Sequence, residues 1–240
     1  MLAELLPLSM LLRKFMAKKL NEFIGRRIDG LVVNTNPFPF LYCQNFFPQD
    51  FYDKMDSIFP TYQHLTPINS KSYQTLDLPV KSRYTLSIFN RGNCYDDLKG
   101  YPFERQAIQM RLWFKEFLIP SLANKLSIQL PEVWDDDTRF VLDLPGYVKR
   151  PHTDVPQKIF SILIYMSDSA CGTTLLKPKQ DGFSDDYGYD HRFDQFEEVF
   201  DPPFKPNSII AFPRTDISFH CVKMLNKGEY RRAIHINIRS

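Results

Sequence analysis

The pattern of apolar and polar positions changes near residue 131. Before that point, apolar residues recur every three or four positions in stretches long enough for helices; after it, short apolar or alternating runs are separated by turn residues. The first pattern predicts helices over 8–26, 48–59 and 103–126, with a kink or break of the last one at Pro120. The second pattern predicts a mainly β structure flanked by these helices.

The first predicted helix places Met16, Leu20, Phe23 and Ile24 on one face and basic residues on the other. We expect it to pack on the outside of the domain, with a membrane surface or a partner as the alternative. The first twelve residues are mostly apolar, but Glu4 lies within this run and the basic residues follow it instead of preceding it, which is the reverse of a secretory signal. The expected location is therefore cytoplasmic.

Two β segments are predicted before residue 131. The run 31–46 favours one or two strands, and Pro37 and Pro39 restrict it to the edge of a sheet because proline cannot donate to a strand ladder. Residues 84–89 alternate as a strand. The polar stretch 60–82 between them predicts a long loop, and loops of this length in a compact domain are often functional.

Short β-like runs dominate the chain after Pro131. There are eight of them: 140–143, 147–152, 159–166, 173–176, 197–200, 208–212, 219–222 and 231–238. This density predicts an antiparallel barrel or double-sheet jelly roll. The polar insert 177–194 is expected to be a loop at one rim, which would cover the pocket together with 60–82.

We expect a single domain over residues 1–240, because no repeat or linker divides the chain. Residues 1–130 would supply helices and strands that support the barrel, and residues 131–240 would form the jelly-roll core that carries the site.

Composition narrows the classes of function. Apolar residues make up 43% of the chain and charged residues 24%, as in ordinary soluble domains. The net charge of +2 gives no field that would favour nucleic acid. The four cysteines lack CxxC spacing, which predicts free thiols and argues against a zinc finger. No apolar run approaches the roughly 18 residues that span a bilayer.

The chemistry is concentrated in the run Arg150-Pro151-His152-Thr153-Asp154. His152 and Asp154 leave the same face of an extended strand, and they are two of the three ligands of a 2-His-1-carboxylate iron site. His220, in an apolar run after a turn, is the candidate for the third ligand. The alternative for the pair alone is a surface turn in which Asp154 caps its neighbours.

The order of motifs around these residues resembles the 2-oxoglutarate- and Fe(II)-dependent oxygenases, in the branch of prolyl-hydroxylase-like and phytanoyl-hydroxylase-like members. Gly-Tyr…Pro-His-Thr-Asp is followed by a strand ending in Tyr-Met, then Gly-Thr…Leu, Pro-Asn-Ser-Ile-Ile-Ala-Phe, Phe-His and Arg-Arg-Ala-Ile. The resemblance is specific after residue 130 and weaker before it. It implies a double-stranded β-helix (jelly roll, cupin-like) that uses Fe(II), 2-oxoglutarate and O₂.

The same resemblance implies roles for residues on two predicted strands. Arg231, eleven positions past His220, stands where the family places the arginine that grips the distal carboxylate of 2-oxoglutarate, with Arg232 as the alternative. Tyr165 stands at or beside a hydroxyl donor to that carboxylate, or is a core tyrosine. By alternation His235 and Asn237 share the inward face with Arg231 and would line the co-substrate pocket, whereas three isoleucines, 234, 236 and 238, would face the helices.

The resemblance also implies the reaction. A carboxylate at Asp154 is typical of hydroxylating members and not of halogenating ones, so we expect hydroxylation or a related oxidation of a C–H bond with release of succinate and CO₂. The alternatives are a cupin-like metalloenzyme without 2-oxoglutarate and a non-catalytic jelly-roll binding module. The expected substrate is a small molecule or a side chain, which the rim cations Arg150, Lys177 and Arg214 could meet if it is anionic; the oligomeric state stays open.

Overall fold

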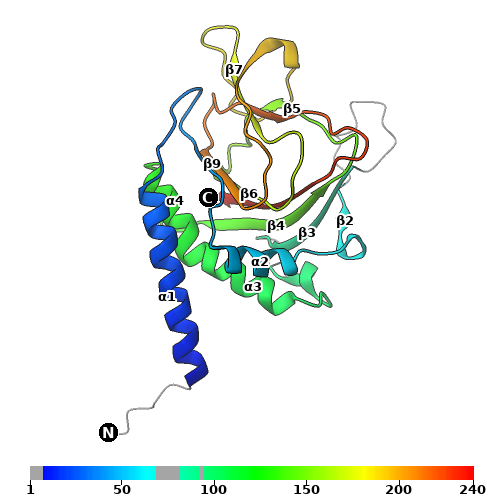
Figure 1. Cartoon of the computed structure of the whole chain (residues 1–240). Helices are drawn as coiled ribbons and strands as arrows, with labels where there is room; N and C mark the ends of the chain where they lie inside the picture. The colour runs from blue at the N-terminus through cyan, green and yellow to red at the C-terminus, as the bar shows by residue number, and fades with distance from the viewer. Residues whose placement is uncertain (1–7, 69–81, 92–93) are drawn as a thin grey trace.

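Two antiparallel sheets form the body of the computed structural model, which describes residues 8–68, 82–91 and 94–240 (Figure 1). The larger sheet has the order β1-β9-β6-β11-β4-β3-β2 and the smaller sheet the order β5-β10-β7-β8. The larger sheet comprises β1 (Leu41–Cys43), β2 (Thr66–Pro67), β3 (Arg83–Phe89), β4 (Asp135–Asp143), β6 (Lys158–Tyr165), β9 (Ser208–Pro213) and β11 (Arg231–Arg239). The smaller sheet comprises β5 (Lys149–His152), β7 (Thr174–Pro178), β8 (Phe196–Phe200) and β10 (His220–Val222).

All eight runs predicted after Pro131 form strands, so the jelly-roll prediction is confirmed. Their order, with consecutive strands alternating between the two sheets over much of this half, is that of a double-stranded β-helix. The strand expected over 140–143 begins earlier, at Asp135, because β4 pairs along its whole length with β11.

Within the described residues, four α-helices precede the second half of the barrel: α1 (Leu8–Asp29), α2 (Gln49–Ser57), α3 (Glu104–Trp113) and α4 (Ile119–Lys125). Short 3₁₀ turns lie at Tyr62–His64, Asp96–Leu98 and Phe193–Gln195. In Figure 1 the helices gather against one side of the larger sheet. Within the described ranges, no helix is long and apolar enough to cross a membrane.

The predicted break at Pro120 takes a different form. The helical path continues through it, and a π-helical turn (Phe114–Leu118) joins α3 to α4, with Pro120 in the first turn of α4. Proline has no N–H to bond the carbonyl four residues earlier, and the wider turn just before it changes the bonding pattern at that point.

The face predicted for α1 is partly wrong. Ile24 and Ile28 are buried, whereas Phe23 is 38% exposed, because the helix contacts the body through a narrower stripe than the sequence pattern suggests. The side chain of Met16 lies outside the described part, as do residues 1–7 and the segment 69–81 of the predicted 60–82 loop.

Alternation along β11 separates the two faces of the larger sheet. Ile234, Ile236 and Ile238 are fully buried in the core that also contains Met110 and Phe114 of the helical layer. The opposite face of β11 looks toward the smaller sheet. The predicted alternation is confirmed: the isoleucines face the helical layer, and the polar face borders the cavity described below.

The edge prediction for 31–46 is confirmed in shortened form. Only Leu41–Cys43 is a strand, and it pairs with β9 alone at the end of the sheet. Pro37 and Pro39 lie in the segment before it, where a bridge joins Asn34 to Phe40.

Candidate active site

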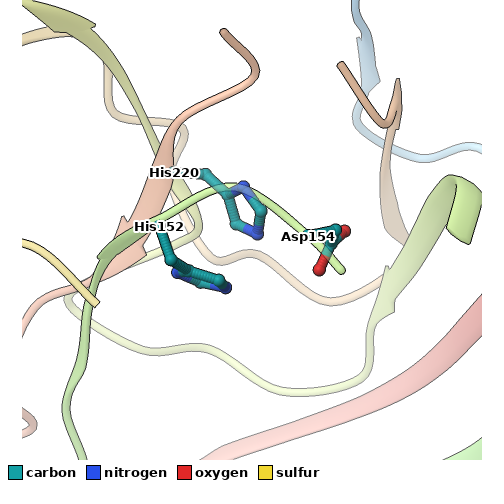
Figure 2. A group of neighbouring side chains, drawn as sticks. All are labelled: His152, Asp154 and His220. Atoms are coloured by element: carbon teal, nitrogen blue, oxygen red, sulfur yellow. The ribbon is translucent and has the colours of Figure 1, made fainter. Parts of the chain in front are cut away.

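Two neighbouring strands of the smaller sheet bring His152 and His220 together. They are directly opposite each other in the β5–β10 register, and Asp154 follows two residues after the end of β5. One ligand atom from each of the three side chains lies within 4.8 Å of the others. Figure 2 shows the three side chains turned toward one another. The grouping predicted from the sequence is therefore present.

Backbone carbonyls orient both imidazoles. Nδ1 of His152 is 2.8 Å from the carbonyl oxygen of Arg150, and Nδ1 of His220 is 3.0 Å from that of Ser218. A carbonyl oxygen can only accept, so Nδ1 carries the proton and Nε2 keeps its lone pair. Burial holds the pKa of both histidines below the ordinary value, further helped at His152 by His220 and Lys149. Both rings are therefore neutral and could bind a metal ion through Nε2.

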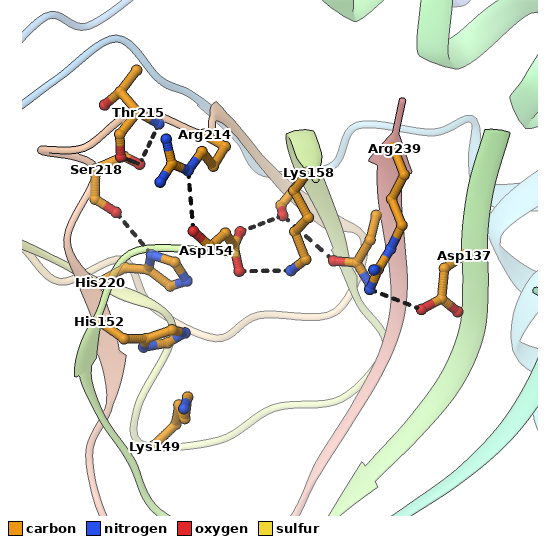
Figure 3. A network of polar contacts seen from close by, with 12 residues as sticks. Asp137, Lys149, His152, Asp154, Lys158, Arg214, Thr215, Ser218, His220 and Arg239 are labelled. Atoms are coloured by element: carbon orange, nitrogen blue, oxygen red, sulfur yellow. Dashed lines mark hydrogen bonds and ion pairs between the residues drawn. The ribbon is translucent and has the colours of Figure 1, made fainter. Parts of the chain in front are cut away.

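The carboxylate of Asp154 is held by two residues that the sequence analysis missed. Lys158 Nζ donates to one oxygen at 2.6 Å and Ser161 Oγ to the other at 2.8 Å (Figure 3). Burial alone would raise the pKa of Asp154, but Lys158 and the two histidines outweigh it and hold the pKa well below its ordinary value. Asp154 is thus a fixed, ionised carboxylate.

A cavity of about 520 Å³ lies between the two sheets and opens onto these three side chains. Its volume is within the range of small-molecule sites. The wall on the smaller sheet includes His152 and His220, and the wall on the larger sheet includes Arg231, His235 and Asn237 of β11. Of the three rim cations proposed from the sequence, Arg150, Lys177 and Arg214, none lines this cavity.

Arg231 is a buried guanidinium without a hydrogen-bond partner among the described residues. It is 1% exposed, none of its three nitrogens has a partner, and its Cζ lies 4.5 Å from the centre of the Phe204 ring. Arg232 points elsewhere and pairs with Asp56 and the carbonyl of Met166. Of the two arginines that the sequence analysis left open for the co-substrate, only Arg231 lines the cavity.

The other three residues proposed for the co-substrate are placed differently from one another. His235 and Asn237 line the cavity, as predicted. Tyr165 does not: it is fully buried behind the wall, stacked on Phe204 at 4.0 Å between ring centres, and its hydroxyl accepts from the backbone N–H of Thr173. The placement of Tyr165 corresponds to the core alternative that the sequence left open.

The insert 177–194, predicted as a rim loop, is bonded to the segment that carries the ligands. Thr153 Oγ1 donates to the carbonyl of Asp185 at 2.8 Å, and the N–H of His191 donates to the carbonyl of Pro151 at 2.8 Å. Gly188 (φ +78°) packs so closely that an added Cβ would be 3.1 Å from backbone atoms of residues 153–155. This loop therefore positions the segment between His152 and Asp154 besides covering it.

Asp185 organises the loop itself. Its carboxylate accepts from the backbone N–H groups of Tyr187, Gly188 and Tyr189 and from His191 Nε2 at 2.9 Å. The sequence analysis missed this role, because Asp185 is one of several aspartates in a polar insert. The signal that could have indicated it is the spacing of Asp185 to residues 187–189, which is that of a local turn.

Comparison with known proteins identifies structures of the same fold. No protein-family model matches the chain, and no curated protein sequence is a match. Solved structures do match. A prolyl-4-hydroxylase from Pseudomonas putida has a TM-score of 0.53 at 16% identity and covers 90% of this chain and 98% of its own. The epimerase SnoN, in complex with Fe3+, alpha ketoglutarate and nogalamycin RO, has a TM-score of 0.55 at 10% identity, over 95% and 84%.

A third similar structure is a prolyl hydroxylase from Trichoplax adhaerens, in complex with a peptide fragment of hypoxia inducible factor. Its TM-score is 0.51 at 13% identity, over 98% of this chain and 94% of its own. At these identities the likeness is one of fold. The chain has the double-stranded β-helix fold of the 2-oxoglutarate- and Fe(II)-dependent oxygenases.

Proposed function

We propose that this protein is an Fe(II)- and 2-oxoglutarate-dependent dioxygenase that hydroxylates, or otherwise oxidises, a C–H bond of its substrate. The observation that carries the proposal is the presence, in one cavity, of a His-Asp-His group and a buried arginine without a partner among the described residues. The first suits a ferrous ion and the second suits a carboxylate. 2-Oxoglutarate is a compound that would engage both.

The donor set fits iron. His152, His220 and Asp154 would hold Fe(II) through two neutral imidazole nitrogens and one ionised carboxylate, the set typical of non-haem ferrous oxygenases. The carbonyls of Arg150 and Ser218 fix the tautomers of the two rings, and Ser161 orients the carboxylate. Hydrogen bonds of this kind, from a neighbouring group to a ligand side chain, fix the orientation of the ligand before the metal binds.

Arg231 fits the far carboxylate of the co-substrate. A buried charged group without a partner is costly, so its retention at 1% exposure points to a ligand of opposite charge. The planar guanidinium can bind a carboxylate through two parallel hydrogen bonds. Phe204 supports it from one side, with Tyr165 stacked behind, and His235 and Asn237 line the same cavity further along β11.

Bound iron and 2-oxoglutarate would supply the oxidising chemistry, in which the co-substrate is converted to succinate and CO₂ at the expense of O₂. The chain itself binds and orients. Two walls of β-sheet flank the cavity, and the loop around Gly188 holds the segment between His152 and Asp154 in place. The carboxylate at Asp154 supports hydroxylation or a related oxidation and not halogenation.

The test is an anaerobic titration. Purified protein with Fe(II) should develop a visible metal-to-ligand charge-transfer band on addition of 2-oxoglutarate, and His152→Ala should lose both the band and metal binding. His64→Ala is the matched control, because His64 lies on a 3₁₀ turn and bonds Thr61, away from the cavity wall. Metal binding without the band would favour the cupin-like metalloenzyme. Absence of both metal binding and the band would favour a non-catalytic binding module.

A further inference from the structure

Arg139 and Arg239 share a single carboxylate on the larger sheet's wall of the cavity. Arg139 forms two hydrogen bonds to Asp137, its neighbour two positions away on β4. Arg239, on β11, is 3.7 Å from the same carboxylate, which is too long for a hydrogen bond, and its Nε has no partner among the described residues. Figure 3 shows Arg239 and Asp137 on neighbouring strands, with Lys158 beside them. One carboxylate thus serves two guanidinium groups.

His235 lies beside this pair and also lacks a partner. It is directly opposite Arg139 in the β11–β4 register and lines the cavity. Its Nε2 is buried and has no hydrogen-bond partner among the described residues. Burial, followed by Arg83, Arg231 and Arg139, holds the pKa of His235 well below its ordinary value. A neutral imidazole is therefore available for a hydrogen bond next to two arginines.

The described wall of the cavity carries more basic than acidic groups. Three of its six lysine and arginine side chains have a carboxylate of their own: Arg83 pairs with Asp143, Lys149 with Asp190 and Lys158 with Asp154. The other three are Arg231, without a partner among the described residues, and the pair that shares Asp137. A ferrous ion and the dianion of 2-oxoglutarate cancel each other in charge, so the positive excess at Arg139 and Arg239 would persist in the loaded site.

The co-substrate does not account for this excess. Arg231 and His235 are four residues apart on β11, which separates their positions by about 13 Å along the strand. Arg139 is opposite His235, so it is equally far from Arg231 in this direction. A five-carbon diacid that spans from the metal ligands to Arg231 has no third carboxylate for the row of Arg139. A further group of negative charge would balance this excess.

We infer that the substrate carries a carboxylate or phosphate group, and that this group binds between Arg139 and Arg239 beside His235. The inference rests on the proposed function and adds the chemical class of its substrate. The anion would accept hydrogen bonds from Arg239 and His235. It would also supply a second negative charge, so that Asp137 would no longer be the single carboxylate beside two arginines. It would also fix the substrate on the larger sheet, across the cavity from the metal ligands.

The experiment measures binding of small anions near the metal site. Protein loaded with Mn(II) in place of Fe(II), and saturated with 2-oxoglutarate, is titrated with inorganic phosphate or with acetate. Paramagnetic broadening of the ³¹P or methyl ¹H resonance gives the affinity, and comparison of the two anions distinguishes a phosphate from a carboxylate substrate. Arg239→Gln and Arg139→Gln should each weaken the anion about tenfold, the size of one charge-assisted hydrogen bond.

Two further variants make the result specific. Asp137→Asn should act in the opposite direction and tighten the anion about threefold, because it removes the competing carboxylate; a variant that merely unfolds cannot do this. Arg192→Gln is the matched control, since Arg192 is 78% exposed and pairs with Asp194 away from the cavity, and it should leave the affinity unchanged.

The possible failures are distinguishable. If the wild-type protein binds neither Mn(II) nor 2-oxoglutarate, the proposed function falls and the inference falls with it. If both bind but neither anion binds, or the anion affinity is the same in Arg239→Gln, Arg139→Gln and Arg192→Gln, the proposed function stands and the anionic substrate is overturned.

Discussion

His152 and His220 lie opposite each other across the β5–β10 pair, with ring centroids 4.3 Å apart, and each ring is bonded through Nδ1 to the carbonyl oxygen two residues before it. The two strands therefore present their histidines in the same way. Since the partners are backbone carbonyls of Arg150 and Ser218, substitutions of those two side chains leave the hydrogen bonds available. Asp154, the third proposed ligand, is held by the side chains of Lys158 and Ser161, so we expect it to be the most sensitive of the three to mutation of its neighbours.

Ser161→Ala should weaken metal binding without unfolding the protein. Ser161 donates to Asp154 at 2.8 Å, and loss of such a second contact typically costs about tenfold or more in metal affinity. A Co(II) titration followed by visible absorption measures the change. Ser208→Ala is the matched control, because Ser208 is equally buried but its hydroxyl has no partner among the described residues. Equal affinities of the two variants would contradict the role given to Ser161.

Arg231→Met should stabilise the ligand-free protein and abolish co-substrate binding. The substitution replaces a buried, unpartnered charge by an apolar side chain of similar length, for which we expect a gain of about 1–3 kcal/mol in the free energy of unfolding. Urea unfolding measures the first effect, and loss of the thermal shift with 2-oxoglutarate measures the second.

Arg232→Met is the comparison for Arg231→Met. Arg232 is paired with Asp56 and bonded to the carbonyl of Met166, so its loss should lower stability and leave the 2-oxoglutarate shift intact. The reverse pattern, with the shift lost in Arg232→Met and kept in Arg231→Met, would show that the wrong arginine has been assigned.

The loop around Asp185 should lose protection only at acid pH. Burial of its carboxyl raises the pKa, but the bonds from His191 and from three backbone N–H groups outweigh this, so the folded pKa lies below the ordinary value. A depressed pKa stabilises the folded loop above the unfolded value, near pH 3.9, and this contribution is lost as pH falls through the folded pKa. Protection factors of the amides in 185–191, taken relative to the intrinsic exchange rate at each pH, should therefore stay high at neutral pH and fall in acid.

Asp185→Asn should raise amide exchange in the same loop at neutral pH and remove most of this acid dependence. Asp181→Asn, in the same insert but exposed, is the control and should behave like the wild-type protein. Identical exchange in the two variants would exclude Asp185 as the centre of the loop.

Gly188→Ala should disturb the proposed metal ligands, although Gly188 is not one of them. The new Cβ would lie 3.1 Å from backbone atoms of residues 153–155, so the segment joining His152 to Asp154 has to shift. Gly182→Ala provides a matched control, because Gly182 also has a positive φ (+73°) but has nothing within 4 Å of the added atom. We expect a weaker Co(II) affinity for Gly188→Ala alone, with similar backbone strain in both variants.

The parts of this structure that the sequence predicts are those governed by local periodicity. Alternation along 231–238 predicts both faces of β11, because a strand has a strict two-residue period and one face meets a continuous apolar layer. The spacing of His152 and Asp154 likewise requires only an extended backbone, although β5 itself ends at His152.

The parts that are not predictable depend on pairing at long range. Whether Tyr165 faces the cavity or the core is decided by the stacking of Phe204, a residue from a distant loop. The contacts of the 177–194 insert with Pro151 and Thr153 are set by how the rim closes, and no local pattern encodes them. On α1, the buried stripe is narrower than the periodic one, because the body of the protein covers only part of the helix.

The seating of Gly188 against residues 153–155 has a consequence for how this protein can change over evolution or in the laboratory. Tyr189 and Asp190, the next residues of the same loop, line the cavity and thus contribute to what it accepts. An insertion, deletion or graft that displaces Gly188 would also move the backbone between His152 and Asp154, the two proposed metal ligands. Changes in this loop are therefore expected to alter substrate selectivity and metal affinity together. A library that varies the loop should be sorted for retained metal binding before it is screened for new substrates.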